Sequence, residues 1–172
     1  MRGGRGSFVV VMIGAVVLVS AGGARATGLD RWLLPLREVE VALARTDLPA
    51  ARRAWQEAYQ AALGSWRWEG MLEVGDARLR LGRAEGHREA AVARARNLYL
   101  AALCRARQQR SVEGALQTAE AFARLGDRRV AEQCVQLTEA LAAETAGPGA
   151  PDRVREFAAR LTDAASRAAA RP

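Results

Sequence analysis

The only histidine of the 172-residue chain, His87, is the side chain best suited to act as a general base near neutral pH. It stands in a polar segment, 83–87, with Glu85 and Glu89 close by in the sequence. No serine or cysteine has an evident reason to meet it, so a nucleophile, a base and an orienting residue cannot be assembled. We therefore expect no catalytic residue and predict that the protein is not an enzyme.

Metal and cofactor sites lack their usual ligands in the same way. One histidine, two cysteines far apart in the sequence and no acidic cluster at ligand spacing do not make a zinc or calcium site. The chain also lacks the glycine-rich loop that binds phosphate groups. The sequence predicts neither a metal site nor a cofactor.

The two cysteines, Cys104 and Cys134, both fall in segments with helical periodicity. Two alternatives stay open for them. In an exported protein they can form a disulfide, which typically adds about 2–4 kcal/mol to stability. Otherwise each is a small buried hydrophobic residue.

Residues 1–26 have the three parts of a secretory signal peptide. Arg2 and Arg5 give a positive start, 8–21 is an apolar run, and Ala24-Arg25-Ala26 is a cleavage signal. The run is shorter than the roughly 18 apolar residues of a membrane-spanning helix. We expect cleavage, an exported protein that is periplasmic or secreted, and no stable membrane insertion afterwards. The alternative is an uncleaved N-terminal membrane anchor.

Every basic residue is an arginine, and the formal net charge is +7, or +4 without the three arginines of the leader. Most arginines are interleaved with glutamates, as is typical of solvated helix faces. Neither a basic cluster nor a set of aromatic side chains for base stacking is present, so we expect no nucleic-acid partner. One predicted helix has an arginine-rich outer face, made of Arg88, Arg94, Arg96, Arg105 and Arg107.

Apolar residues recur at helical spacing through the rest of the chain, and no alternating strand pattern interrupts them. The sequence therefore predicts an all-α fold. Within 27–146 we expect three antiparallel helix pairs, followed by a Gly/Pro linker at 147–151 and a last helix in 152–172. The six paired helices are expected at about 29–45, 47–63, 65–82, 88–109, 111–125 and 127–145.

Local signals mark some of the helix ends and one close contact. Ser65 and Ser111 can each accept a hydrogen bond from the first turn of a following helix. Gly126 can adopt the left-handed conformation that ends a helix. Gly75 lies inside a predicted helix, at a cost of roughly 1 kcal/mol relative to alanine. We expect it to mark a close helix contact or a bend.

The first and third pairs share a pattern, in LARTDLPAARRAWQEAYQAAL (43–63) and FARLGDRRVAEQCVQLTEAL (122–141). It resembles the tetratricopeptide repeat family, which has two antiparallel helices per repeat, a Gly-Asp-like turn, and a small residue in the second helix. The resemblance implies helical hairpins stacked as a short superhelix, closed by a C-terminal capping helix. A plain helical bundle is the alternative.

The register of the middle pair is ambiguous. If Ala91 is its small residue, the matching positions Ala51, Ala91 and Ala131 are evenly spaced by forty residues, with a longer loop at 83–87. If it is Ala95, the aromatic Tyr99 aligns with Trp55 instead. We prefer the first register.

The resemblance also implies a function, because tetratricopeptide-like domains bind partners on a concave face lined by the first helices. We therefore expect an exported adaptor that binds a peptide segment of a partner. The alternative is a structural accessory subunit of a cell-envelope complex, built as a plain helical bundle. The residues that the resemblance places on the face are Arg67, Glu73, Arg78, Gln117 and Arg124.

Two tryptophans lie two positions apart at the start of the third predicted helix. Residues at that spacing on a helix do not face the same way. We expect Trp66 to be the exposed one of the pair, and Trp68 to be buried. An exposed tryptophan beside Arg67 can anchor a partner peptide. Alternatively, it covers the junction between two hairpins.

Overall fold

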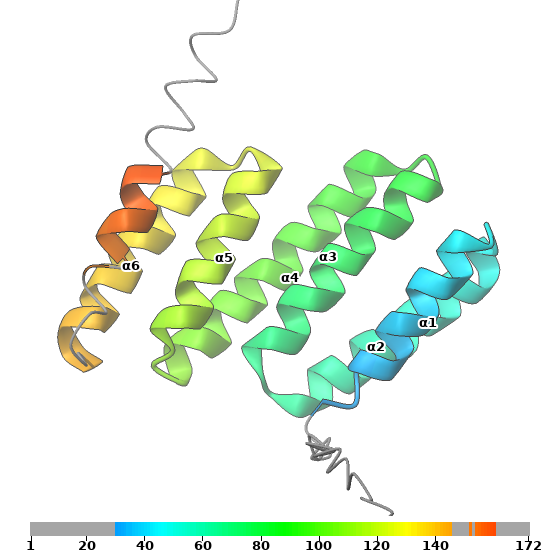
Figure 1. The fold of residues 1–172 in the computed structure, drawn as a ribbon, viewed down its shortest axis with the longest axis horizontal. Coiled ribbons are helices and arrows are strands. Elements are labelled where there is room, and N and C mark those ends of the chain that lie inside the picture. Colours follow the sequence, from blue (N-terminus) through cyan, green and yellow to red (C-terminus); the bar gives the residue numbers. More distant parts are fainter. Residues whose placement is uncertain (1–29, 146–151, 153, 161–172) are drawn as a thin grey trace, which may run out of the picture.

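The computed structural model describes residues 30–145, 152 and 154–160, and every regular element in these ranges is helical (Figure 1). The predicted all-α fold is confirmed. The predicted leader and the predicted linker at 147–151 lie outside the described residues. The six paired helices are α1 (Leu33–Ala44), α2 (Leu48–Ser65), α3 (Trp68–Ala84), α4 (Arg88–Gln108), α5 (Val112–Leu125) and α6 (Arg128–Thr145).

The six helices form three antiparallel pairs that lie side by side in chain order (Figure 1). Each pair shares a seam, and each second helix also contacts the first helix of the next pair. The first helices touch one another across pairs, α1 with α3 and α3 with α5. Between the second helices of the described chain, contacts of that extent do not occur. The first helices therefore form one closely packed layer.

A shorter helical segment at 154–160 follows the third pair. Its Val154 and Phe157 are buried and belong to the same hydrophobic core as the paired helices. Leu116 of α5 and Phe157 line one shallow groove, and Ala142 of α6 and Val154 line another. The segment therefore covers the last pair, where a closing helix was predicted.

The turns within the three pairs have the same geometry and recur every forty residues. Their central residues, Thr46, Gly86 and Gly126, have φ angles of 58°, 73° and 83°. The residue that follows each of them donates its N–H to a carbonyl five residues earlier, over 2.8 to 3.0 Å. This is the hydrogen bond of a Schellman motif, which ends a helix by satisfying one of its last carbonyls. The three turns are therefore structurally equivalent.

The equivalence of the turns decides the register of the middle pair. Ala51, Ala91 and Ala131 stand at the same distance after their turns, and all three are buried. The predicted longer loop at 83–87 shrinks to 85–87, because α3 runs on to Ala84, and it is then as long as the connection at 45–47 between α1 and α2. The even spacing of forty residues is the register of this structure.

One predicted helix start is wrong. Ser65 does not cap α3; it is the last residue of α2, and its hydroxyl donates to the carbonyl of Ala62 over 2.8 Å. The chain leaves α2 through Trp66 in the left-handed conformation, and α3 begins only at Trp68. The predicted cap at Ser111 is confirmed, since its Oγ accepts the N–H of Gly114 over 3.0 Å.

Helix α3 makes two of its closest contacts with α4 through glycine. A Cβ added at Gly82 would lie 2.1 Å from the Cβ of Ala91, and one added at Gly75 would lie 2.5 Å from the ring of Tyr99. Both distances are well inside van der Waals contact. The predicted close approach at Gly75 is confirmed, and Gly82 holds a second one at the other end of the helix pair.

We predict that Gly82→Ala destabilises the protein, because the new methyl group overlaps Ala91 and forces α3 and α4 apart. Overpacking of this kind typically costs about 1–3 kcal/mol, partly offset by the roughly 1 kcal/mol gained in helix propensity. Gly64→Ala is the matched control, since Gly64 is also helical but has nothing within 4 Å of an added Cβ. Urea unfolding should show a loss for Gly82→Ala and a small gain for Gly64→Ala. Equal effects would contradict the close contact.

Candidate interaction surface

The outer side of the first-helix layer carries two parallel polar stripes, one on α3 and one on α5. Within each stripe the residues follow one another at steps of four, three and four, which keeps them on one face of the helix. We call these eight residues the first-helix face: Glu69, Glu73, Asp76 and Arg80 on α3, and Glu113, Gln117, Glu120 and Arg124 on α5.

Charge is distributed unequally between the two layers. The first helices α1, α3 and α5 hold seven acidic residues and five arginines, whereas the second helices α2, α4 and α6 hold five acidic residues and nine arginines. Five of the eight residues of the first-helix face are acidic. A chain that is basic as a whole therefore presents an acidic surface on one side.

Side-chain bonds tie the first helices to one another. Trp32 donates its Nε1–H to Glu73 over 2.8 Å, and Arg80 donates to Glu40 over 2.7 Å, so both join α3 to the α1 side. Arg124 of α5 lies 3.5 Å from Asp76 of α3. Exposed ion pairs contribute only about 0–1 kcal/mol each, so these bonds orient the helices more than they stabilise them.

Glu73 is a partly buried carboxylate of the first-helix face. Burial of its carboxyl raises the pKa of Glu73; the hydrogen bond from Trp32 opposes this, and the nearby Asp30, Glu69 and Asp76 add to the rise. Three neighbouring carboxylates disfavour the negative charge of a fourth. Arg67 pairs with Asp30 and Glu69, and Arg124 lies 3.5 Å from Asp76, so arginines already balance part of this charge.

Tyr99 of α4 holds Asp76 in place, because the Tyr99 hydroxyl donates a hydrogen bond to Oδ1 of Asp76. Burial raises the pKa of Tyr99, and the bond to Asp76 adds to this, so the hydroxyl stays protonated and remains a donor. The ring of Tyr99 also packs edge-on against Phe122, at 5.7 Å between centroids. The carboxylate of Asp76 is thus fixed in position on the face.

Arg78, expected on this face, lies on the opposite side of α3. Its guanidinium donates to Glu85 over 3.1 Å and sits 5.6 Å from the ring centroid of Trp55. Glu85 also accepts from Arg52 of α2, and its side chain is nearly buried. Burial acts to raise the pKa of Glu85, but the bond from Arg52 and the charge of Arg78 bring it below its usual value. Arg78 fastens the turn between α3 and α4 onto α2.

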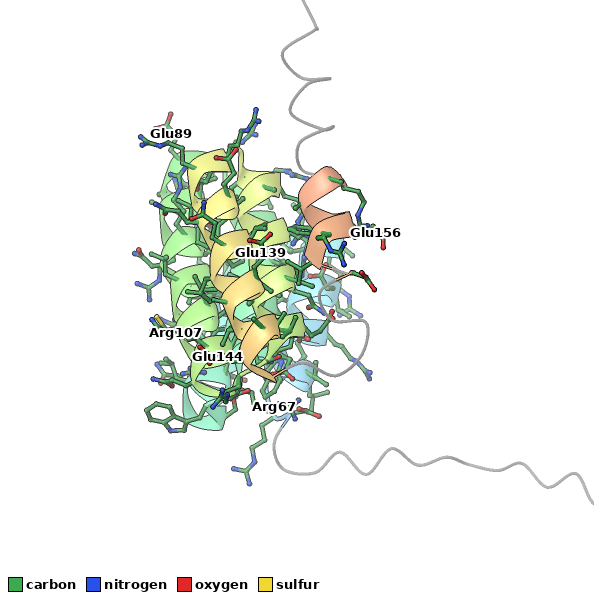
Figure 2. The ribbon with its side chains drawn as sticks, turned by 90° about the vertical axis from the view of Figure 1, so that its left-hand side faces the viewer. Arg67, Glu89, Arg107, Glu139, Glu144 and Glu156 are labelled. Atoms are coloured by element: carbon green, nitrogen blue, oxygen red, sulfur yellow. The ribbon has the colours of Figure 1, made fainter. Side chains whose placement is uncertain are left out.

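The other residues that were predicted to bind a partner lie at different places in the structure. Gln117 and Arg124 lie on the first-helix face; Gln117 donates to Glu113 over 2.8 Å. Arg67 stands at the start of α3, where it pairs with Glu69 at 2.5 Å and with Asp30 at 3.5 Å. Glu73, Gln117 and Arg124 thus belong to the first-helix face, and only Arg124 has a contact across it, with Asp76. Figure 2 shows Arg67 at one end of the molecule.

Trp66 is exposed and Trp68 is buried, as predicted, with 70% and 7% of their surfaces accessible. The reason differs from the one expected. The two residues do not share a helix, because Trp66 lies in the connection between α2 and α3 with a φ of 58°. A left-handed conformation is uncommon for a bulky residue, so the surrounding structure must hold this tryptophan in place.

Arg105 holds Trp66, and its place in the structure corrects the sequence analysis. It was expected on the outer face of α4 but is buried. Its guanidinium donates to the carbonyls of Ala62, Leu63 and Arg67 over 2.9 to 3.1 Å, and lies 5.6 Å from the ring centroid of Trp66. A cation at the C-terminus of α2 satisfies carbonyls that the helix leaves unpaired. Arg105 thus fixes the end of α2 and the connection that carries Trp66.

The residues considered for catalysis and covalent chemistry are not gathered in one place. His87 is exposed at the start of α4, and its side chain makes no capping hydrogen bond to the helix. Both cysteines are free, Cys104 on the surface and Cys134 in the core, where burial raises its pKa to about 11. Among the described residues, no three His, Cys, Asp or Glu side chains are arranged so that they could hold a metal ion.

The described helices also lack a membrane-spanning candidate: none of them is both long enough and apolar enough to cross a bilayer. Comparison of the chain with protein-family models, curated proteins and solved structures finds no match in any of the three.

We predict that Arg105→Met destabilises the protein by about 2–4 kcal/mol, because three carbonyls lose charge-assisted hydrogen bonds in a buried site. The emission of the exposed Trp66 should also shift once its support is gone. Arg107→Met, two residues away on the exposed side of the same helix, is the control. If urea unfolding gives the same free energy for both variants, Arg105 does not have this structural role.

For Glu73 we predict a stabilising substitution with a definite pH dependence. A carboxyl whose pKa is raised by folding costs stability when it is ionised, so the cost is full at neutral pH and vanishes below the pKa of the unfolded chain. Glu73→Gln keeps an acceptor for Trp32 and should raise the unfolding free energy at pH 7. The gain should shrink as the pH falls towards 4. Glu120→Gln should give no comparable gain; a gain independent of pH would refute the explanation.

Proposed function

We propose that this protein is an exported, non-catalytic interaction module of the tetratricopeptide-like type, and that it binds a peptide segment of a partner on its first-helix face. The observation that carries the proposal is the packing of α1, α3 and α5 into one layer, in which α3 and α5 carry the polar first-helix face. The forty-residue recurrence of turn, buried alanine and helix pair supports a repeat architecture.

The packing also suggests which side of the stack is hollow. First helices of neighbouring pairs contact one another, and second helices of the described chain do so less. The distance between neighbouring helices is therefore expected to be shorter in the first-helix layer than in the second-helix layer. The inner side of a curved stack of helix pairs is its shorter side. Stacked repeats use such concave surfaces to bind extended segments.

Charge favours a basic segment as the partner. Glu69, Glu73 and Asp76 follow one another along α3, and Glu120 extends the negative charge onto α5. Complementary charge raises the association rate and the specificity of an interface. Trp66 is exposed in the connection between α2 and α3, where its ring lies against Arg105 of α4, and it offers a second, apolar anchor, as aromatic residues do at many interfaces.

The test is affinity capture from the extracytoplasmic fraction of the host, with the tagged protein as bait. Glu120→Arg reverses a charge on the first-helix face, and Glu57→Arg makes the same change on the exposed side of α2. We expect one recurrent partner that is depleted about tenfold with Glu120→Arg and retained with Glu57→Arg, as the loss of a complementary contact requires. Retention by both variants would place binding elsewhere.

A permanent structural subunit of a cell-envelope complex is the second candidate. The exposed apolar side of α1, with Leu34 and Val41, favours it, because such surfaces are usually covered in stable assemblies. A subunit of this kind would copurify with its complex in fixed proportion, and no single reversal on the first-helix face would release it.

A further inference from the structure

A shallow groove runs between α5 and the segment 154–160, beside the first-helix face. Its floor is apolar, with Leu116 from α5 and Phe157 from the segment, and its volume is about 210 Å³. The α5 wall consists of residues of the first-helix face: Glu113, Gln117 and Glu120. This space, which we call the α5 groove, therefore continues the first-helix face beyond α5.

The opposite wall of the α5 groove comes from the segment 154–160. Glu156 and Arg160 line it, four residues apart and so on one face of the helical segment. Figure 2 shows Glu156 on the same side of the molecule as the blue helix α1, whereas Arg107 and Glu89 of α4 lie on the other side. The groove thus has carboxylates on both walls and belongs to the first-helix side of the structure.

The charges of the α5 groove are not balanced within it. Three glutamates and one arginine line it. Glu113 accepts a hydrogen bond from Gln117 over 2.8 Å. Glu120 and Glu156 are both exposed, and neither forms an ion pair with another of the described residues. A cation that enters the groove therefore meets two carboxylates that are available to bind it.

The floor of the groove suits a particular kind of cation. The guanidinium carbon of Arg160 lies 5.8 Å from the ring centroid of Phe157, so this ring already contacts an arginine of the same chain. A guanidinium is planar and weakly hydrated, and it packs on apolar and aromatic surfaces while it donates to carboxylates. The ammonium group of lysine is compact and strongly hydrated. An apolar floor between acidic walls therefore fits arginine better than lysine.

We propose that the α5 groove binds an arginine side chain of the partner segment. The methylene groups of this arginine lie on Leu116, and its guanidinium faces Glu120 and Glu156 on the two walls. The inference rests on the proposed function, because the arginine belongs to the segment bound on the first-helix face. It adds the identity and the place of one anchor. The acidic stripes attract any basic segment, and the groove selects arginine at the α5 end of the face.

NMR titration of the ¹⁵N-labelled protein with N-acetylarginine methylamide tests the groove directly. We expect saturable shifts confined to the backbone amides of 113–120 and 154–160, with a Kd on the order of 1–10 mM for so small a ligand. The lysine analogue should bind at least about threefold more weakly. Glu156→Gln should weaken arginine binding about threefold, as the loss of one exposed ion pair requires.

Glu139→Gln is the matched control, because Glu139 is an exposed carboxylate of α6 that lines a different groove. It changes the net charge equally and should leave the affinity for the arginine probe unchanged. Shifts that do not saturate or that lie elsewhere would overturn the proposal. Equal affinities of the two variants, or equal binding of the lysine probe, would overturn it as well.

Affinity capture separates this proposal from the proposed function. Glu156→Arg changes a residue outside the first-helix face, and Glu139→Arg makes the same change on α6. We expect the partner to be depleted with Glu120→Arg and with Glu156→Arg, and retained with Glu139→Arg. Depletion with Glu120→Arg alone would overturn the arginine site and leave the proposed function intact. Retention by the variants of both Glu120 and Glu156 would refute the two together.

Discussion

Helix α3 contacts four other helices, and glycine occupies three of its buried positions. Gly75 meets Tyr99 and Gly82 meets Ala91 at distances that leave no space for a methyl group, and a Cβ added at Gly70 would lie 3.0 Å from Trp32 and Ala62, a tight contact. The glycines cost helix propensity, and the close packing that they permit offsets that cost. The layer of first helices, which carries the acidic surface, therefore depends on the close packing that these glycines permit around α3.

Polar contacts then fix the parts that close packing leaves undetermined. Arg105 satisfies the carbonyls at the end of α2 and supports Trp66, while Glu85, held by two arginines, fixes the turn after α3. Arg96 holds Asp127 of the third pair in a similar way, through two hydrogen bonds. Arginines of the second helices therefore bind groups of the neighbouring pair, and the acidic residues of the first helices remain at the surface.

Much of this architecture could be predicted from the sequence, because helical periodicity and turn residues act locally. The helix pairs, the register of Ala91 and the close contact at Gly75 follow from such signals. The position of Arg78 could not be predicted, since its partner Glu85 lies seven residues away, beyond the reach of helix spacing rules. Arg105 was misplaced because the carbonyls that it binds become neighbours only when the pairs stack. Glu120, to which we assign a role only in the proposed binding, was not singled out, although completing the stripe from Gln117 would have found it.

The central claim is that partners bind on the first-helix face, and carboxylate footprinting tests it most directly. Exposed carboxylates of the protein are labelled with and without the captured partner and quantified by mass spectrometry. Our account predicts that the partner protects Glu69 and Glu120 and leaves Glu57 and Glu89, on the second helices, reactive. Figure 2 shows Glu89 and Arg67 at opposite ends of the molecule. Protection of Glu57 and Glu89 alone would contradict the account and place the binding surface on the opposite layer.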